Sequence, residues 1–411
     1  MMNRINAVLF ATVLGSTLAV QPSSAGEQVV PAALPTSVKI VSSLPRTGSA
    51  NAQTTSMVNG IRMALTEIGG KVAGVEVSYE DWDDASPQRG NWDPSIEAAN
   101  ADKAIADAEV VAYIGTYNSG ASKVSMPKLN GAGLSMVSPG NTYPGLTKPG
   151  FGEANEPMVY RPSGKINYFR VVPTDDVQGF VAAEFAKSLN ATKVFVLHDR
   201  ELYGQGIAQV FNDSAKKLGI EVVEFDGLDT KAANYKSVAT KIKQSKAEVV
   251  FYGGTTQTNA AQLAKDLASQ KVDVKLIVPD GCFEEAFIKA AGSKALEGRC
   301  FITFGGVEPK LLGGRGKEFY ENYKTLYGKE PEAYAAYGYE AAKVVLSAME
   351  RAAKKGSLSR AAVLAEIAAT KDFSGALGTW SFDENGDTTN KVMSVNTVKD
   401  DKFETVKVIG N

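Results

Sequence analysis

The stretch EVVAYIGTYNSGAS, residues 109–122, passes from an apolar run into small hydroxyl, amide and glycine residues. The apolar run predicts a buried strand, and the change in composition predicts that a helix begins near Ser119. Such a turn presents free backbone N–H groups at a helix N-terminus, and these favour a small anion without help from lysine or arginine. The stretch therefore predicts a strand, a turn that receives a carboxylate or a similar group, and a helix.

The same alternation of strands and helices continues on both sides of this stretch. Amphipathic segments such as residues 56–70 and 94–108 separate apolar runs, which is typical of βαβ units around a parallel sheet, so we expect an α/β fold. The runs that predict strands are residues 38–44, 75–81, 109–115, 134–139, 168–173, 193–199, 220–226, 247–254 and 274–281.

A segment rich in glycine and proline, residues 143–166, divides this alternation into two sets. The segment is too long for an ordinary connection, so we expect either a functional rim or a packed surface loop. The two sets of strands predict two lobes. Near the C-terminus, Asn385 and Gly386 lie between strand-like runs, which indicates a β-hairpin turn.

The chain has 411 residues, of which 44% are hydrophobic and 22% charged, and its formal net charge is -2. This length and apolar content are sufficient for two domains with separate cores. A protein that binds nucleic acid usually gathers lysine and arginine on one face, and this nearly neutral sequence contains no basic cluster. We therefore expect no nucleic-acid partner.

The first 25 residues have the features of a secretory signal peptide. Arg4 precedes an apolar run, and Ser23 and Ala25 are small residues at positions that favour cleavage after Ala25. The run is shorter than the roughly 20 residues that span a membrane. We expect residues 1–25 to be removed, residues 26–36 to form a leader, and the mature protein to be soluble in the periplasm.

Export to an oxidising compartment bears on the two cysteines, Cys282 and Cys300. They flank a short predicted helix and its following turn, so they form either a disulfide or two free buried thiols. Two cysteines and a single histidine, His198, supply too few ligands for a metal site. The acidic run at residues 80–88 lacks the glycine and the final glutamate of a calcium-binding loop, and we expect it to be a solvated turn.

An enzyme is the main alternative class for a two-lobed α/β protein. His198 would be the general base, but neither a G-x-S-x-G motif nor an H-E-x-x-H motif accompanies it, so we expect a structural residue at a strand end. The segment GGRGKE, residues 313–318, lacks the earlier glycine of a phosphate-binding loop and has glutamate after its lysine. We expect no catalytic residue, no metal and no cofactor.

Six segments occur in an order that resembles the leucine/isoleucine/valine-binding proteins, which are type I periplasmic solute-binding proteins of ABC importers. The segments are SLPRTGSA, IGTYNSGAS, MVSPGNTYPGLT, LHDRELYGQGIA, VFYGGTTQT and VPDG. The resemblance extends from about Ser37 to the hairpin near Asn385.

The resemblance implies a two-lobed fold in which each lobe is a mostly parallel sheet flanked by helices, with a three-strand hinge. Lobe 1 would consist of residues 37–172 with 306–394, and lobe 2 of residues 173–305 with 395–411. The crossovers of the hinge would lie near residues 171–174, 304–307 and 393–396.

The resemblance also implies how a ligand is held. Ser119 matches a serine at a helix N-terminus whose hydroxyl and N–H receive the ligand carboxylate. Gly140 and Thr142 match two positions that contact the α-ammonium and the carboxylate, and Asp280 matches the acid that pairs with the ammonium. Burial of both ligand charges is tolerable when each has such partners. The four residues would clamp a zwitterion.

Four further residues match positions around the cleft, and they carry less specific roles. Tyr203 would face the cleft from the second lobe, and Tyr117 and Gln53 would lie near the ligand side chain. Thr255 stands where these proteins often carry an aromatic residue, so a leucine-shaped pocket is not assured. No cysteine stands at Asn118 or near Ser86, where the family has a disulfide in its first lobe.

Three tyrosines, Tyr334, Tyr337 and Tyr339, are expected to pack along a helix. The function implied by the resemblance is that of a monomeric receptor for an amino acid, branched-chain or a related hydrophobic or neutral one, which delivers its ligand to a membrane permease. The alternatives are a receptor for aromatic or aliphatic carboxylates or small amides, and a sensory ligand-binding module.

Overall fold

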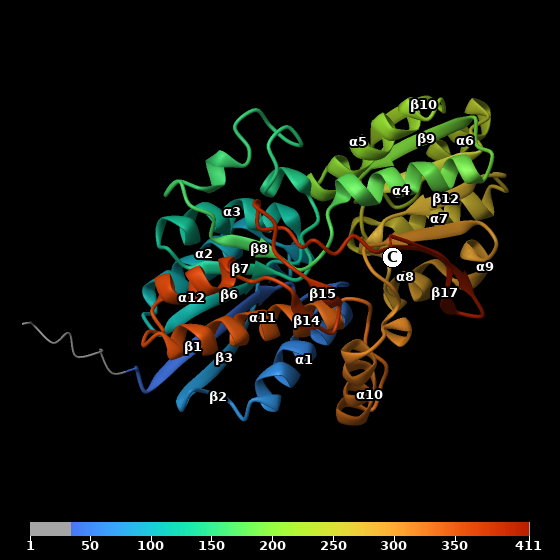
Figure 1. The fold of residues 1–411 in the computed structure, drawn as a ribbon. Helices are drawn as coiled ribbons and strands as arrows, with labels where there is room; N and C mark the ends of the chain where they lie inside the picture. Colours follow the sequence, from blue (N-terminus) through green and yellow to red (C-terminus); the bar gives the residue numbers. More distant parts are fainter. Residues whose placement is uncertain (1–33, 411) are drawn as a thin grey trace, which may run out of the picture. The chain divides into compact units, whose positions relative to one another are not determined.

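Two β-sheets with helices on both faces organise residues 34–410, the part of the chain that the computed structural model describes (Figure 1). The predicted signal peptide, its cleavage after Ala25, and leader residues 26–33 lie outside these residues. No helix between residues 34 and 410 is long and apolar enough to span a membrane.

The first sheet has the strand order β2-β3-β1-β6-β7-β8, and all its neighbouring strands are parallel except β2 and β3. It begins with the first predicted strand and ends just after the insert. The strands are β1 (Ser37–Leu44), β2 (Lys71–Val72), β3 (Val75–Asp83), β6 (Val110–Gly115), β7 (Ser135–Ser138) and β8 (Tyr168–Arg170).

Helices cover both faces of the first sheet because its central strands are apolar on both sides. Ile40 and Val41 are neighbours in β1 and point to opposite faces, Ile40 into a core shared with α1 and α11, and Val41 into a core shared with α2 and α3. We call this layered unit the first lobe. Its helices are α1 (Asn51–Glu67), α2 (Pro94–Ala106), α3 (Ser119–Gly131), α10 (Arg315–Tyr327), α11 (Ala335–Lys354) and α12 (Arg360–Ala368).

The second sheet has the order β10-β9-β11-β12-β13-β16-β17, with antiparallel pairing only at β13-β16 and β16-β17. Its strands are β9 (Lys193–His198), β10 (Glu221–Gly227), β11 (Val249–Gly253), β12 (Lys275–Val278), β13 (Cys300–Phe304), β16 (Met393–Lys399) and β17 (Lys402–Ile409). His198 is the last residue of β9, as the sequence predicts.

The second sheet is also buried on both faces, and we call its layered unit the second lobe. Val194 packs with α4 and α5 on one face, while its neighbour Phe195 packs with α6 and α7 on the other. The helices are α4 (Asp175–Ser188), α5 (Leu202–Lys217), α6 (Lys236–Ser245), α7 (Ala260–Ser269), α8 (Glu285–Ala291) and α9 (Ser293–Leu296). The residue ranges predicted for the lobes stay a prediction, because the described residues form one compact unit.

Two glycines allow α11, which comes late in the sequence, to pack directly on α1. A Cβ atom at Gly60 of α1 would lie 2.4 Å from the carbonyl oxygen of Ala335, and one at Gly338 of α11 would lie 2.4 Å from that of Met57. Any larger residue would push the two helices apart. This close crossing fixes the start of α11 beside the carboxyl edge of the first sheet.

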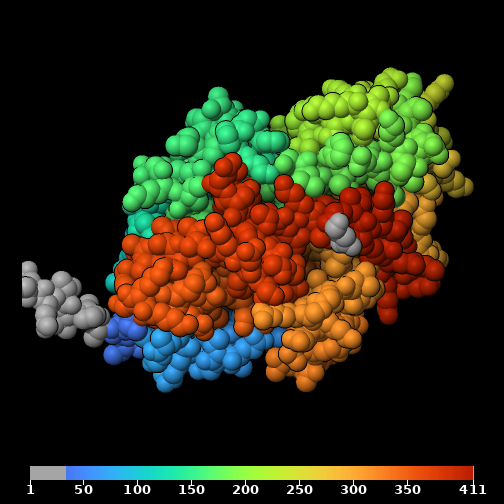
Figure 2. Space-filling view, viewed as in Figure 1, coloured from blue at the N-terminus to red at the C-terminus, as the bar shows by residue number. Residues whose placement is uncertain are grey.

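The insert, residues 143–166, is a packed surface loop with two short 3-10 turns, η1 (Pro144–Leu146) and η2 (Met158–Tyr160). Tyr143 and Tyr160 are buried, and the hydroxyls of both donate to the carboxylate of Glu156. Lys148 forms an ion pair with Asp176 of α4 at 2.9 Å. Figure 2 shows the insert in green beside the lighter green surface of α4 and α5.

Three sequence expectations need correction or refinement. The run at residues 168–173 was expected to begin the second set of strands, but it forms β8, the edge of the first sheet. The turn at Asn385 and Gly386 exists, but one bridge between Phe382 and Thr388 replaces the expected pair of strands. Cys282 and Cys300 are buried free thiols, so the disulfide alternative is not realised.

The acidic run at residues 80–88 is not a solvated turn, because β3 extends through Asp83 and Asp84 is fully buried. Neither carboxylate oxygen of Asp84 has a hydrogen-bond partner among the described residues. Burial raises the pKa of Asp84 well above its usual range, and burial likewise raises the pKa of its neighbour Glu97 to about 7. Glu97 is anchored by hydrogen bonds from Ser43 at 2.6 Å and Tyr113 at 3.0 Å.

Glu97→Gln should remove part of the pH dependence of stability. In the unfolded chain Glu97 loses its proton near its ordinary pKa of 4.5, whereas burial raises this pKa to about 7 in the folded protein. The unfolded state therefore binds fewer protons in this window, and folding stability falls as the pH rises through it. We expect wild type to lose about 1–3 kcal/mol more than Glu97→Gln in this window. Urea unfolding at both ends of the window measures the difference.

The matched control is Glu318→Gln, which removes the same charge at an exposed position of α10. Its stability should follow that of wild type at every pH. An identical pH dependence in wild type and Glu97→Gln would show that Glu97 is ionised in the folded protein.

Candidate functional site

Six of the eight predicted binding residues line a single cavity of about 20 Å³. The turn after β6 and the turn after β7 supply its wall on the first lobe, and the turns after β9, β11 and β12 supply the other wall. The site thus lies at the carboxyl ends of both sets of parallel strands, where open α/β sheets bind ligands. Its lining residues are Tyr117, Asn118, Ser119, Gly140, Tyr203, Thr255, Asp280 and Gly281.

The part of the site that is predicted to receive the ligand's carboxylate is built from two loops. Ser119 is the first residue of α3, as predicted, and its buried hydroxyl accepts a 3.4 Å hydrogen bond from the N–H of Tyr143. Thr142 is 1% exposed, and its hydroxyl has no hydrogen-bond partner among residues 34–410. Buried polar groups are nearly always paired, and the carboxylate of Asp175 lies near enough to this hydroxyl for the contact to oppose the rise in the pKa of Asp175.

Asn141 ties these two loops together. Its side-chain N–H groups donate to the carbonyl oxygen of Tyr117 at 3.0 Å and to the hydroxyl of Thr116 at 3.2 Å. Its side-chain oxygen accepts from Ser122 and from Tyr168. The loop that carries Thr142 is therefore held in a fixed position relative to the start of α3.

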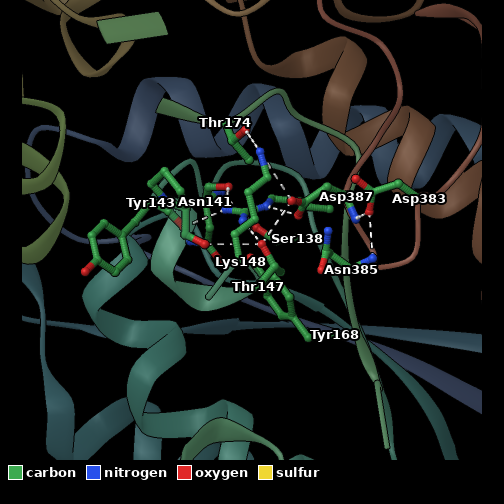
Figure 3. Close-up of polar contacts among 12 residues, drawn as sticks. Ser138, Asn141, Tyr143, Thr147, Lys148, Tyr168, Thr174, Asp383, Asn385 and Asp387 are labelled. Atoms are coloured by element: carbon green, nitrogen blue, oxygen red, sulfur yellow. Dashed lines mark hydrogen bonds and ion pairs between the residues drawn. The ribbon is translucent and has the colours of Figure 1, made fainter. Parts of the chain in front are cut away.

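Arg170 also holds this loop. Its guanidinium donates to the carbonyl oxygens of Asn141 at 3.1 Å and Tyr143 at 2.8 Å, the residues on either side of Thr142. It also donates to Asp387 at 2.6 Å and to the hydroxyl of Thr147. Figure 3 shows Asn141, Tyr143 and Asp387 gathered in this region. The side chain of Arg170 is fully buried, so Asp387 balances a charge that water does not reach.

The wall of the cavity on the second lobe is centred on Asp280, which is 4% exposed. We call this wall the acid side. The carboxylate of Asp280 accepts hydrogen bonds from Tyr203 at 2.6 Å, from Gln178 at 2.8 Å, and from the hydroxyl of Tyr334. Burial raises the pKa of Asp280 above its usual range, although the three hydrogen bonds oppose the shift. No lysine or arginine forms a salt bridge with Asp280 within the described part of the chain.

A second buried carboxylate, Asp175, stands at the first turn of α4. Neither of its oxygens has a hydrogen-bond partner among the described residues, and its backbone N–H donates to the carbonyl oxygen of Thr142 at 2.9 Å. Burial, and then the nearby charge of Asp280, raise the pKa of Asp175 well above its usual range. Two buried carboxylates in mutual repulsion favour a cationic group beside them.

Two of the predicted binding residues already use their polar groups in hydrogen bonds within the protein. Gln53 is fully buried and bridges the lobes, because it donates to the carbonyl oxygen of Phe283 at 3.3 Å and accepts from the N–H of Tyr334 at 3.1 Å. Thr255 lines the cavity, but its hydroxyl caps the 3-10 turn η3 (Thr256–Thr258) by accepting from the N–H of Thr258. Neither side chain has its polar group free for a ligand.

Three residues of the acid side were not expected from the sequence. Tyr334 was predicted to pack along a helix, but its hydroxyl reaches Asp280 and its ring meets Tyr117 edge to face at 5.8 Å. Gln178 and Asp175 were not singled out. The acidic pair before VQG, directly after a predicted crossover, was the signal that could have identified Asp175.

A model of the family described as "Periplasmic binding protein" matches residues 37–402. An "amino acid binding protein" from Pseudomonas aeruginosa is 28% identical over 311 residues, which are 75% of this chain and 77% of that protein. A "Leu/Ile/Val-binding protein homolog 2" from Brucella abortus is 28% identical over 346 residues, which are 84% of this chain and 85% of that protein.

Solved structures share the fold. A leucine binding protein LivK from Thermotoga maritima has a TM-score of 0.79 at 30% identity and covers 90% of this chain and 98% of that one. A solute binding protein from R. palustris in complex with benzoate has a TM-score of 0.75 at 17% identity and covers 90% and 96%. The two-lobed α/β fold predicted from the sequence is confirmed.

Asp387→Asn should destabilise the protein strongly, because it leaves the guanidinium of Arg170 buried without a counter-charge. Loss of one partner of a buried ion pair costs about 3–5 kcal/mol. Urea denaturation measures the change in the free energy of unfolding. Glu76→Gln, which breaks an exposed ion pair with Lys71, is the control and should cost less than about 1 kcal/mol. Equal small losses in both variants would contradict the role given to Arg170.

Proposed function

The chain belongs to the periplasmic binding protein family, whose members bind solutes and are not enzymes, and from this we propose that it binds an α-amino acid for an ABC importer. The α-carboxylate lies against Ser119 and Thr142, and the α-ammonium lies against Asp280. The observation that carries the proposal is the division of charge in the cavity, with uncharged donors on one lobe and buried carboxylates on the other.

Uncharged donors suit the carboxylate because hydroxyl groups and the N-terminus of α3 stabilise an anion without a competing cation. Gly140 contributes by its lack of a side chain, since a Cβ atom there would lie 3.1 Å from the ring of Tyr117. On the opposite lobe, the ammonium supplies a positive charge beside Asp280, which has no salt-bridge partner among the described residues. Both ligand charges are then paired, which is the condition for burying them.

Binding requires the lobes to separate and close again. The cavity of about 20 Å³ has room for roughly one water molecule, whereas small-molecule sites are several hundred cubic ångströms in size. The three predicted crossovers, residues 171–174, 304–307 and 393–396, serve as the hinge. Closure around the ligand brings the donors and the acids together, as in other hinged receptors.

The cellular setting follows from the same proposal. The protein is exported, cut after Ala25, and works in the periplasm as a monomer that presents its closed form to a membrane permease. Relatives named for leucine, isoleucine and valine favour a branched-chain or related neutral ligand. A sensory module with the same ligand chemistry would differ only in its membrane partner.

A receptor for plain carboxylates is the second candidate. Asp280 already receives three hydrogen bonds from the protein, so its carboxyl group has partners without an ammonium. A fold neighbour was solved in complex with benzoate. An aromatic or aliphatic acid would then use Ser119 and Thr142 alone.

Thr142→Val should weaken ligand binding without weakening the fold. The change keeps the shape of the side chain and removes a hydroxyl that has no partner in the described structure. Hydrogen bonds to charged groups contribute about 1.5–3 kcal/mol, so the dissociation constant measured by calorimetry should rise by about 10- to 150-fold. Thr240→Val, at an exposed position of α6, is the control. Unchanged affinity in Thr142→Val would remove Thr142 from the site.

Asp280→Asn should distinguish the two candidate ligands. If the ligand is an α-amino acid, loss of the negative charge beside the ammonium should cost several kcal/mol of affinity, while affinity for the corresponding deaminated acid should change little or rise. Calorimetry with both ligands on wild type and on Asp280→Asn separates the loss of the charge from other effects of the substitution. Tighter binding of the deaminated acid by wild type, with no loss in Asp280→Asn, would favour the plain carboxylate.

A further inference from the structure

A second set of polar atoms belongs to the turns that form this cavity. Three acceptor oxygens there are buried without a hydrogen-bond partner among the described residues, Oδ1 of Asn118, Oε1 of Gln257 and Oε2 of Glu284. Asn118 lines the cavity from the first lobe, and Gln257 and Glu284 belong to the turns after β11 and β12 on the second lobe. Unpaired buried oxygens are rare in folded proteins.

Glu284 is the charged member of this set. It occupies the N-cap position of α8, yet its side chain makes no capping hydrogen bond and is 1% exposed. Its Oε1 lies 3.5 Å from Nε2 of Gln257, and the hydroxyl of Thr256 is close enough to lower the pKa of Glu284. The neighbouring charge is that of Glu332, also acidic. Among residues 34–410, no lysine or arginine pairs with this buried carboxylate, and its Oε2 has no hydrogen-bond partner.

The contacts of its neighbours direct Glu284 toward the ligand cavity. Gln53 of α1 donates to the carbonyl oxygen of Phe283, so the residue before Glu284 touches the first lobe. Burial, and next the charge of Glu284, raise the pKa of Tyr117, which lines the cavity. The carboxylate of Glu284 is thus close enough for its charge to act on Tyr117, which belongs to the other lobe.

We propose that this end of the cleft is a subsite for N–H donors, in which Glu284, Gln257 and Asn118 receive the side chain of the ligand. The ligand is then an α-amino acid whose side chain carries an amide, ammonium or guanidinium group, and not a branched aliphatic chain. This inference rests on the proposed function, because it needs the α-groups to be held at Ser119, Thr142 and Asp280.

The reason is that an aliphatic side chain leaves all three oxygens unpaired, whereas a donor-bearing one pairs them. A site built to hydrogen-bond a ligand N–H rejects the analogue without it far more strongly than an apolar pocket rejects a missing methylene. Burial also raises the pKa of Glu284 to about 8, so an amide binds beside a neutral Glu284 and a cation binds beside an ionised one.

The experiment is calorimetry on the full mature protein with asparagine and leucine, which have nearly the same shape but differ in their N–H donors. Glutamine and lysine extend the series, with norleucine as the apolar match to lysine. We expect at least one donor-bearing amino acid to bind about 100-fold or more tightly than its apolar match. Comparison of asparagine and glutamine with lysine shows whether the subsite binds an amide or an ammonium group.

Two substitutions of Glu284 test its role in the subsite. Glu284→Met keeps the volume and removes the acceptors, so the preference over the apolar match should fall by about tenfold or more. Glu284→Gln should weaken lysine more than asparagine. Glu285→Gln is the matched control, since its side chain is exposed and pairs with Lys289 outside the cleft. Thermal unfolding verifies that each variant is folded.

Each outcome decides a separate point. Leucine or norleucine binding as tightly as its donor-bearing match would overturn this subsite and leave the amino-acid receptor in place. A preference that Glu284→Met and Glu284→Gln leave unchanged would overturn the assignment to Glu284. Binding of benzoate with no binding of any amino acid would instead overturn the proposed function.

Discussion

The buried guanidinium of Arg170 is the constraint on which the binding loop depends. A cation without exposed surface must have its donors paired inside the protein. Those of Arg170 reach Asp387 from the C-terminal turn and the carbonyl oxygens of Asn141 and Tyr143. Arg170 ends β8 and directly precedes the first predicted hinge crossover. One side chain thus joins three segments far apart in sequence and sets the position of Thr142 against the hinge.

Charge in the cleft is distributed unevenly, and this is a cost to the protein itself. Asp175, Asp280 and Glu284 are buried on the second lobe, and burial raises the pKa of each. Residues that are arranged to bind a ligand are commonly destabilising in its absence. A ligand with positive or donor groups offsets this cost, so the groups that weaken the free protein are the ones that strengthen the complex.

All nine predicted runs form strands because buried parallel strands are continuous apolar runs, whereas β13, β16 and β17 were not among them. Ser119 and Asp280, which the family resemblance singled out, line the same cavity, since the carboxyl ends of parallel strands share one edge. Tyr334 was missed because it reaches Asp280 only through the packing of α11 on α1, where Gly60 and Gly338 allow close approach. No local pattern contains that information.

Asp84 and Gln53 show a different limit of sequence reading. Asp84 lies in a run of acidic residues that reads as solvated, and only the extension of β3 places it inside the protein. Gln53 was matched to the ligand cleft, but it does not line the cavity, and both polar atoms of its amide are hydrogen-bonded to backbone groups. A residue's position can follow from a pattern, whereas its partners depend on the tertiary structure.

Several contacts between the lobes are complete without a ligand. Gln53 reaches Phe283, Tyr334 reaches Asp280, and Lys148 of the insert reaches Asp176. These contacts stabilise the closed arrangement by the protein's own groups, so less of the ligand's binding energy is needed for closure. Thr142, Asp175 and Glu284 have side-chain oxygens without a hydrogen-bond partner among residues 34–410, and under our proposal the contacts of the ligand with these oxygens discriminate between ligands.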